Sequence, residues 1–233
     1  MVDTDSIFVS GLKDKEQGDR LEAFINKGFD NYAKSQGLKK HRLRIEFEAF
    51  ATRAIMVAKK RYAMKLSDGR YKIAGFQLKR SDAQIITKEV QETILHQILS
   101  GANKKETREY YHRIKDEILS GEHQYEIGIP HKFTKRLDKY ADSSAIRGAY
   151  FSNEHLGTHI GAGDKCLIYH IKQIRAGLPT TTTLALEDDM EIPEGYTIDI
   201  RKHWERMEKA LLPLLNDLDI LEKSKQVNLS DFI

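Results

Sequence analysis

The sequence has very little cysteine and no long apolar run. Its 233 residues include one cysteine, Cys166, so no disulfide can form within the chain, and a reducing compartment is expected. No apolar stretch approaches the roughly 18 residues that a membrane-spanning helix needs. Residues 1–6 have neither the basic nor the apolar region of a secretory signal peptide. These absences exclude secreted disulfide scaffolds and membrane spans, and they predict a soluble, cytoplasmic protein with no membrane partner.

Charge is distributed unevenly along the chain, although the net charge is only +3. Residues 39–80 hold 13 Lys and Arg against three acids, whereas residues 181–233 hold six Lys and Arg against 12 acids. The surplus of positive charge in the first of these stretches suits contact with a polyanion. The alternative is an ordinary solvated face.

The first third of the chain reads as a small sheet with a helix. Asp14 and Gln17 form a capping box that opens a helix over residues 14–36, because apolar residues follow at helical spacing. Four short strands are predicted, over residues 6–10, 43–48, 55–58 and 70–73. Residues 67–69 carry a turn signal. We therefore expect an antiparallel sheet that carries the basic stretch.

From residue 81 the pattern becomes mainly helical. Two helices are predicted over residues 81–101 and 103–121, each ending at a glycine. Their capping boxes are Ser81 with Gln84 and Asn103 with Glu106. Later helices are predicted over residues 132–140, 143–153 and 201–221, with a strand over 166–171. The predicted fold class is α+β, with domains at residues 1–80 and 81–221 and a tail at 222–233.

Two acids close to the first residue, Asp3 and Asp5, flank Thr4. On an extended strand, residues i and i+2 point to the same side, so the two carboxylates would project together about 6–7 Å apart. Two negative charges that close repel unless a cation lies between them. Hard oxygen ligands suit Mg²⁺. The alternative is that the pair caps a turn.

Two basic segments follow the predicted strand at residues 55–58. Lys-Lys-Arg-Tyr-Ala occupies residues 59–63, and Gly-Phe-Gln-Leu-Lys-Arg-Ser-Asp occupies residues 75–82. Cations beside an aromatic ring suit contact with phosphates and sugars of a nucleic acid. Taken singly, each segment is explained equally well by a solvated strand end.

Other reactive side chains point to no further site. The nine histidines show no spacing typical of metal ligands. The glycine-rich residues 158–163 lack the Lys-Ser/Thr ending of a P-loop, which argues against a nucleoside triphosphate site there. Cys166 is expected in the core of its strand, and Trp204 on the apolar face of the last helix.

The order of these segments resembles the C-terminal part of a family B DNA polymerase of the archaeal type. Asp-Thr-Asp-Ser resembles that family's palm motif, and Lys-Lys-Arg-Tyr resembles its motif where palm passes to thumb. Residues 75–82 resemble the segment that opens the thumb. The resemblance implies a small antiparallel palm sheet segment with a helix, followed by a mainly helical thumb. It also implies a DNA-directed DNA polymerase, a nucleotidyltransferase of DNA replication.

The resemblance also implies a role for particular residues. Asp5 and Asp3 would be the catalytic carboxylates that bind Mg²⁺, and Glu48 would be a further metal ligand. Two metal ions about 3.5–4 Å apart would activate the primer 3′-hydroxyl and stabilise the leaving pyrophosphate. Lys60 and Tyr62 would contact the minor groove and backbone at the primer end. The other implied DNA contacts are Lys59, Arg61, Lys79 and Arg80.

Several parts of such a polymerase have no counterpart in this sequence. The motif that supplies the other catalytic aspartate, the fingers helix and the exonuclease motifs are all missing. Met1-Val2 also stand where the family usually has Tyr-Gly. We therefore expect a large family B subunit as partner in a heterodimer that binds primer–template DNA and dNTP. The chain is then the small subunit of a split polymerase, or else a fragment, and the rival hypothesis is a non-catalytic DNA- and clamp-binding accessory protein.

The C-terminal tail carries a separate pattern. It resembles the peptide with which proteins bind a sliding clamp (PCNA-like), with Gln226, Leu229, Phe232 and Ile233 at the matching positions. Residues three apart align on a 3₁₀ turn. Leu229 and Phe232 would therefore form one apolar plug beside the Gln226 hydrogen bonds. The alternative is a frayed terminus with a chance match.

Overall fold

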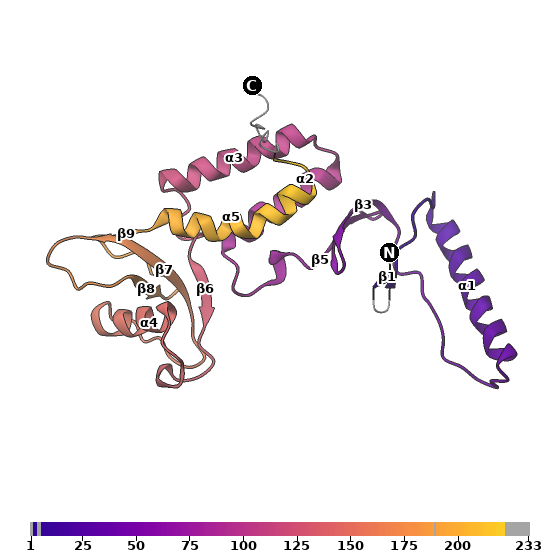
Figure 1. Cartoon of the computed structure of the whole chain (residues 1–233), viewed down its shortest axis with the longest axis horizontal. Helices are drawn as coiled ribbons and strands as arrows, with labels where there is room; N and C mark the ends of the chain where they lie inside the picture. The colour runs from indigo at the N-terminus through magenta and orange to yellow at the C-terminus, as the bar shows by residue number, and fades with distance from the viewer. Residues whose placement is uncertain (1, 4–5, 189, 222–233) are drawn as a thin grey trace, which may run out of the picture. The chain divides into compact units, whose positions relative to one another are not determined.

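A computed structural model describes residues 2–3, 6–188 and 190–221, and it gives only the backbone of residues 2 and 3. Helix makes up 42% and strand 19%, and the strands form small antiparallel sheets, which confirms the predicted α+β class. Contacts divide the chain into two units, Met1–Gly75 and Phe76–Ile233 (Figure 1). The finer division into palm, thumb and tail stays a prediction.

The first unit contains the helix that its capping box predicts. Helix α1 runs from Lys15 to Ser35, and the Asp14 side chain accepts a hydrogen bond from the Gln17 backbone N–H at 2.9 Å. The Gln17 side chain accepts in turn from the Lys13 backbone N–H at 3.0 Å. One backbone donor of the first turn, that of Gln17, and one just before the helix, that of Lys13, are thereby satisfied.

The strand predicted over residues 43–48 is wrong. No strand partner lies beside this segment among the described residues; its backbone is bonded to side chains of α1 instead. Ile45 exchanges two hydrogen bonds of 3.0 Å with the Asn26 amide, and the Phe47 N–H donates to Glu22 at 2.7 Å. The alternation reflects one side facing a helix, and Phe47 lies directly against Gly18 of α1.

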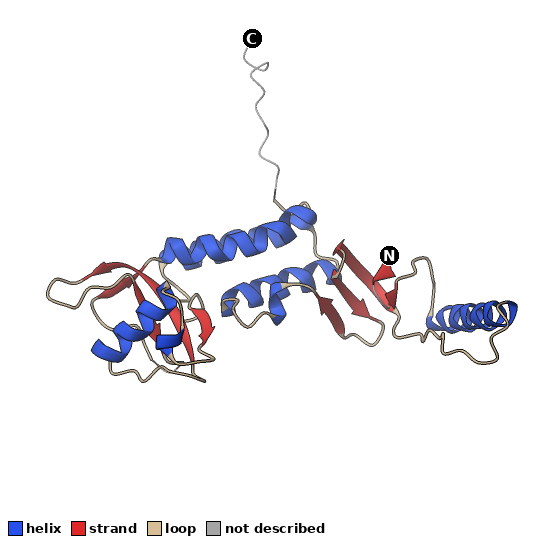
Figure 2. Cartoon of the chain, turned by 60° about the horizontal axis from the view of Figure 1, so that its bottom comes forward, coloured by secondary structure: helices blue, strands red, loops and turns tan. Residues whose placement is uncertain are grey.

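A three-stranded antiparallel sheet follows, in the order β3-β4-β5, shown in red in Figure 2. Its strands are β3 (Ala51–Ala58), β4 (Arg61–Leu66) and β5 (Tyr71–Ala74). The predicted strands at residues 55–58 and 70–73 fall on β3 and β5, and Gly69, with φ 86°, turns the chain between β4 and β5. Strand β4 was not separately predicted, because the basic segment that begins it reads as a strand end.

Three long helices of the second unit pack on one another. They are α2 (Ile85–Ser100), α3 (Lys104–Ser120) and α5 (Ile200–Asp217), and Figure 1 shows α5 lying along the α2–α3 hairpin. The Asn103 cap of α3 forms as predicted. The predicted capping box of Ser81 with Gln84 is wrong, because the Gln84 side chain is buried and donates to the Ile127 carbonyl at 2.7 Å.

Beside these helices lies a four-stranded antiparallel sheet. Its strands are β6 (Ile129–Lys132), β7 (Lys165–Ile174), β8 (Thr183–Leu186) and β9 (Tyr196–Ile198), and β7 pairs with the other three. Helix α4 (Ser144–His155) packs on β8. The helix predicted over residues 132–140 is wrong, because Ile129–Lys132 pairs with β7 and only the short η2 (Leu137–Lys139) is helical beyond it.

The second unit holds most of the buried apolar side chains. Cys166 of β7 and Trp204 of α5 are both buried, as predicted. Of the helices in the described part of the chain, none is long and apolar enough to cross a membrane.

Candidate nucleic-acid and metal interface

The N-terminal motif does not form the single strand that was predicted. Strand β1 (Val2–Asp3) pairs antiparallel with β2 (Ser6–Ile7), so Asp3 faces Ser6 across the pair. Backbone donors and acceptors need partners, and this short pairing supplies them locally. Asp5 lies outside the described residues, and the position of the Asp3 side chain is not described, so their metal-binding roles stay predictions.

An aromatic contact joins this motif to the Lys-Lys-Arg-Tyr segment. The rings of Phe8 and Tyr62 pack edge to face with centroids 5.0 Å apart and an interplanar angle of 61°. Tyr62 is part of β4, whereas Phe8 directly follows β2. Aromatic pairs of this geometry contribute about 0.5–1.5 kcal/mol beyond the area they bury. The contact holds the residue that follows β2 against the Lys-Lys-Arg-Tyr segment.

Glu48 reaches the same face of the sheet as Tyr62. Side chains alternate along a strand, so Tyr62 and Met64 of β4 point to one face. Lys72 of β5 lies opposite Met64 and shares that face. Glu48 forms an ion pair with Lys72, although its own side chain is 70% exposed. Thus three segments that the resemblance singles out meet on one sheet face.

Mg²⁺ chemistry fits the predicted ligands. All three candidates, Asp3, Asp5 and Glu48, offer carboxylate oxygens, which are the ligands that Mg²⁺ prefers. Of these three carboxylates, that of Glu48 is the one whose position is described, and it is paired with the Lys72 ammonium group. A metal ion would take the place of that ammonium group.

Lys59 and Lys60 form the exposed turn between β3 and β4. Lys60 has φ 63°, a left-handed conformation that few side-chain-bearing residues adopt. Its carbonyl oxygen lies so close to Gly75 that any Cβ there would overlap it. Arg61 begins β4 directly after the turn. The absence of a side chain at Gly75, in the second basic segment, therefore allows the close approach of the Lys59–Lys60 turn in the first.

Lys79 and Arg80 belong to the second unit. Lys79 ends the short η1 (Gln77–Lys79), and the Arg80 guanidinium donates two hydrogen bonds to Asp82, at 2.9 and 2.8 Å. This pairing raises the pKa of Arg80 and lowers the pKa of Asp82. Asp82 therefore engages two of the five guanidinium N–H donors of Arg80, and a phosphate would bind through the others or by displacing Asp82.

One cationic pair was missed in the sequence. Arg53 of β3 lies directly opposite Lys65 of β4, on the face away from Tyr62. Like charges placed opposite each other across strands repel. The Lys65 ammonium lies 5.9 Å from the ring centre of Tyr71, the next residue across the sheet. A bound anion would relieve this repulsion. The sequence did not reveal the pair because only the register of β3 against β4 brings the two cations together.

Comparison with known proteins identifies the class of protein to which these features belong. A sequence model of DNA polymerase family B matches residues 2–144, and the chain therefore belongs to that family. It is 31% identical over 161 residues to a DNA polymerase of Archaeoglobus fulgidus, a match covering 66% of this chain and 19% of the relative. It is 30% identical over 146 residues to a DNA polymerase of Pyrococcus glycovorans, covering 60% of this chain and 17% of the relative.

A third relative, a DNA polymerase of Thermococcus aggregans, is 33% identical over 99 residues, which are 42% of this chain and 5% of the relative. The chain thus spans less than a fifth of the length of the curated relatives it matches. The family confirms the resemblance read from the motifs. The residues of the clamp-binding pattern, Gln226 to Ile233, lie outside the described residues.

Proposed function

We propose that this chain supplies part of the palm and the thumb of a DNA-directed DNA polymerase, and that it works only in complex. The observation that carries the proposal is the meeting of Phe8, Tyr62 and Glu48 on one sheet face. This meeting supports a site in which the residues that follow Asp-Thr-Asp-Ser, the Lys-Lys-Arg-Tyr segment and a carboxylate lie near one another, as two-metal phosphoryl transfer would require. Such an enzyme would act in the cytoplasm, in association with the nucleoid.

Asp5, Asp3 and Glu48 would hold Mg²⁺ in this proposal. The metal ions, when bound, would neutralise charge on the dNTP phosphates and activate the primer hydroxyl. The chain's own contribution is to hold its carboxylates and the primer end in place. Lys72 would keep the Glu48 carboxylate oriented until metal and nucleotide arrive.

Duplex DNA would lie against the basic side chains. The proposed contacts are Lys59, Lys60, Arg61, Tyr62, Lys79 and Arg80. The lysine turn projects two ammonium groups into solvent, where they suit adjacent backbone phosphates. Contacts through phosphates and the minor groove are nearly blind to base sequence, which replication requires.

The first unit has the surface of a protein that needs a covering partner. Its buried apolar residues, among those described, are only Ala33, Ala63, Met64 and Leu66. Its exposed large apolar residues are Ile7, Val9, Phe24, Tyr32, Leu38, Leu43 and Met56, and Phe24 is 75% exposed. A unit with so few buried and so many exposed large apolar side chains suits binding to a partner surface.

A large family B subunit would cover this surface. It would bring the exonuclease, the fingers and the other catalytic aspartate. A permanent interface of this kind buries more than about 2,000 Å². We expect the two chains to co-purify as a heterodimer.

The tail would bind a sliding clamp. Deleting residues 226–233 should abolish stimulation by a PCNA-like clamp and leave basal synthesis unchanged. An equal loss of both activities would mean that the tail is structural and would overturn this part of the proposal.

The rival function is a non-catalytic accessory protein that grips duplex DNA and the clamp. The ion pair of Glu48 with Lys72 favours it, because that carboxylate already has a partner. The discriminating experiment is Asp5→Asn in the reconstituted complex, with Asp19→Asn on an exposed position of α1 as control. Loss of primer extension with DNA affinity kept supports the polymerase. Unchanged extension supports the accessory protein.

A further inference from the structure

The C-terminal end of α3 gathers three side chains that bind metals in other proteins. Glu117 lies in the last turn of α3, and Glu122 and His123 follow Gly121, the left-handed residue that ends the helix. One ligand atom from each of the three side chains lies within 4.8 Å of the others. None of them belongs to the proposed polymerase site, and the sequence pattern did not reveal them.

The distance between two of these groups suits an ion better than a hydrogen bond. His123 Nε2 lies 3.4 Å from Glu117 Oε2, beyond the 2.7–3.2 Å range typical of N–H···O hydrogen bonds. A tetrahedral ion with bonds of about 2.0–2.1 Å separates its ligand atoms by roughly 3.3–3.4 Å. The two groups therefore already stand at the spacing of one tetrahedral edge.

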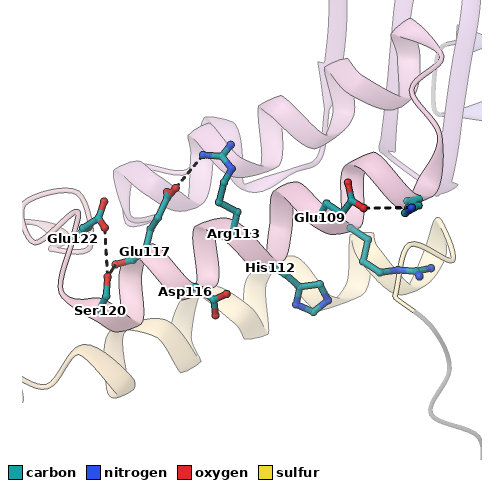
Figure 3. Close-up of a pocket in the computed structure, with 9 residues that line it drawn as sticks. Glu109, His112, Arg113, Asp116, Glu117, Ser120 and Glu122 are labelled. Carbon is teal, nitrogen blue, oxygen red and sulfur yellow. Dashed lines mark hydrogen bonds and ion pairs between the residues drawn. The ribbon is translucent and has the colours of Figure 1, made fainter.

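Neighbouring side chains orient the ligands. Arg113 Nη1 donates to Glu117 Oε1 at 3.0 Å (Figure 3). The other carboxylate oxygen, Oε2, is the one that lies 3.4 Å from His123 Nε2. The Ser120 hydroxyl donates to the Glu117 carbonyl at 2.8 Å and lies 3.5 Å from Glu122 Oε1. Outer contacts of this kind fix ligand geometry at metal sites. An open groove of about 710 Å³ along α3, lined by Glu117 and Glu122, gives an ion access.

We propose that Glu117, Glu122 and His123 form a Zn²⁺ site. One imidazole nitrogen and two carboxylate oxygens suit Zn²⁺, whereas Mg²⁺ and Ca²⁺ prefer oxygen ligands throughout. Three protein ligands leave a fourth position for water. The ion would clip the end of α3 to the loop that leads toward β6, and this role does not depend on the polymerase proposal.

Titration of the full-length chain with Zn²⁺ tests the site by calorimetry. Millimolar Mg²⁺ in the buffer occupies any site made of oxygen ligands alone. We expect one bound Zn²⁺ in the wild type and at least about tenfold weaker affinity in Glu117→Gln and in His123→Asn. Asparagine suits the second variant because His123 has φ 59°, which asparagine tolerates well.

The matched control is His112→Asn, on the same helix and the same groove. It should bind Zn²⁺ as the wild type does. Zn²⁺ at 100 times its wild-type Kd should also raise the Tm of wild type and control by roughly 5–10 °C, and raise the Tm of both site variants by no more than about half as much. The proposal is overturned if the wild type binds no Zn²⁺, if His123→Asn binds it equally well, or if His112→Asn loses it too.

Discussion

Acid should destabilise the second unit through one buried histidine. His203 of α5 is fully buried, donates from Nδ1 to the Ile127 carbonyl at 2.8 Å, and accepts from the His170 N–H through Nε2 at 2.9 Å. Accepting at Nε2 requires the neutral imidazole, whereas the Nδ1–H bond to Ile127 is compatible with either protonation state. Burial is the main cause that lowers the pKa of His203 to about 4; the charges of His170 and Arg206 act in the same direction, and the Ile127 hydrogen bond and Asp199 oppose them.

The sign and size of the effect follow from this pKa. As pH falls below about 6.5, the ordinary pKa of histidine, His203 becomes protonated in the unfolded chain, whereas in the folded chain it stays neutral down to about pH 4. Stability is therefore complete above pH 6.5 and is lost toward pH 4. The loss amounts to about 2 kcal/mol between pH 7.5 and 5.0 and about 3 kcal/mol in full.

Urea unfolding followed by Trp204 fluorescence measures this loss. Trp204 is the single tryptophan, is buried, and neighbours His203 on α5, so its emission reports the second unit. His203→Asn should be less stable at pH 7.5 and should lose about 2 kcal/mol less than the wild type on going to pH 5.0. The control His159→Asn removes an exposed imidazole and should keep the wild-type loss. Equal losses in wild type and His203→Asn would refute the reasoning.

Three further predictions concern backbone packing and DNA contact. Gly28→Ala should stabilise α1 by up to about 1 kcal/mol, because the space around Gly28 is open. Gly18→Ala should destabilise the first unit, because Phe47 fills the space that a Cβ at Gly18 would need. Circular dichroism during thermal unfolding compares the two variants, and equal effects would contradict the packing. Gly75→Ala should cost more stability than Gly69→Ala, since both have positive φ but only Gly75 lies against the Lys60 carbonyl; urea unfolding of each variant would expose an error if the order were reversed. Duplex affinity of the double variant Lys59→Ala/Lys60→Asn should fall less steeply with salt than that of the wild type, by roughly two released counterions. An unchanged slope in fluorescence anisotropy would remove both residues from the interface.

Local signals in the sequence predicted the helix starts well. Asp14 and Asn103 each cap a helix by accepting a hydrogen bond from a backbone N–H three residues later. Both partners of each bond therefore lie within one short segment of the sequence. Gln84 carries the same signal but bonds to Ile127, 43 residues away. A capping box fails as a prediction where a distant buried group competes for its side chain.

The strand predicted over residues 43–48 failed because a helix, and not another strand, supplies its backbone partners. The alternation at residues 43–48 indicates one buried side correctly, yet Asn26 and Glu22 of a helix take the backbone bonds. For the candidate site, the motif order indicated the family and the residue types. The Phe8–Tyr62 contact and the Arg53–Lys65 pair depend on fold and register, which no single segment encodes.

Primer extension by the purified chain, alone and mixed with a companion polypeptide that carries the fingers and the exonuclease, tests the central claim most directly. The account predicts no DNA synthesis by the chain alone, and Mg²⁺-dependent synthesis after mixing that Asp5→Asn abolishes. Extension of the primer by the chain alone, or by the mixture carrying Asp5→Asn, would contradict it.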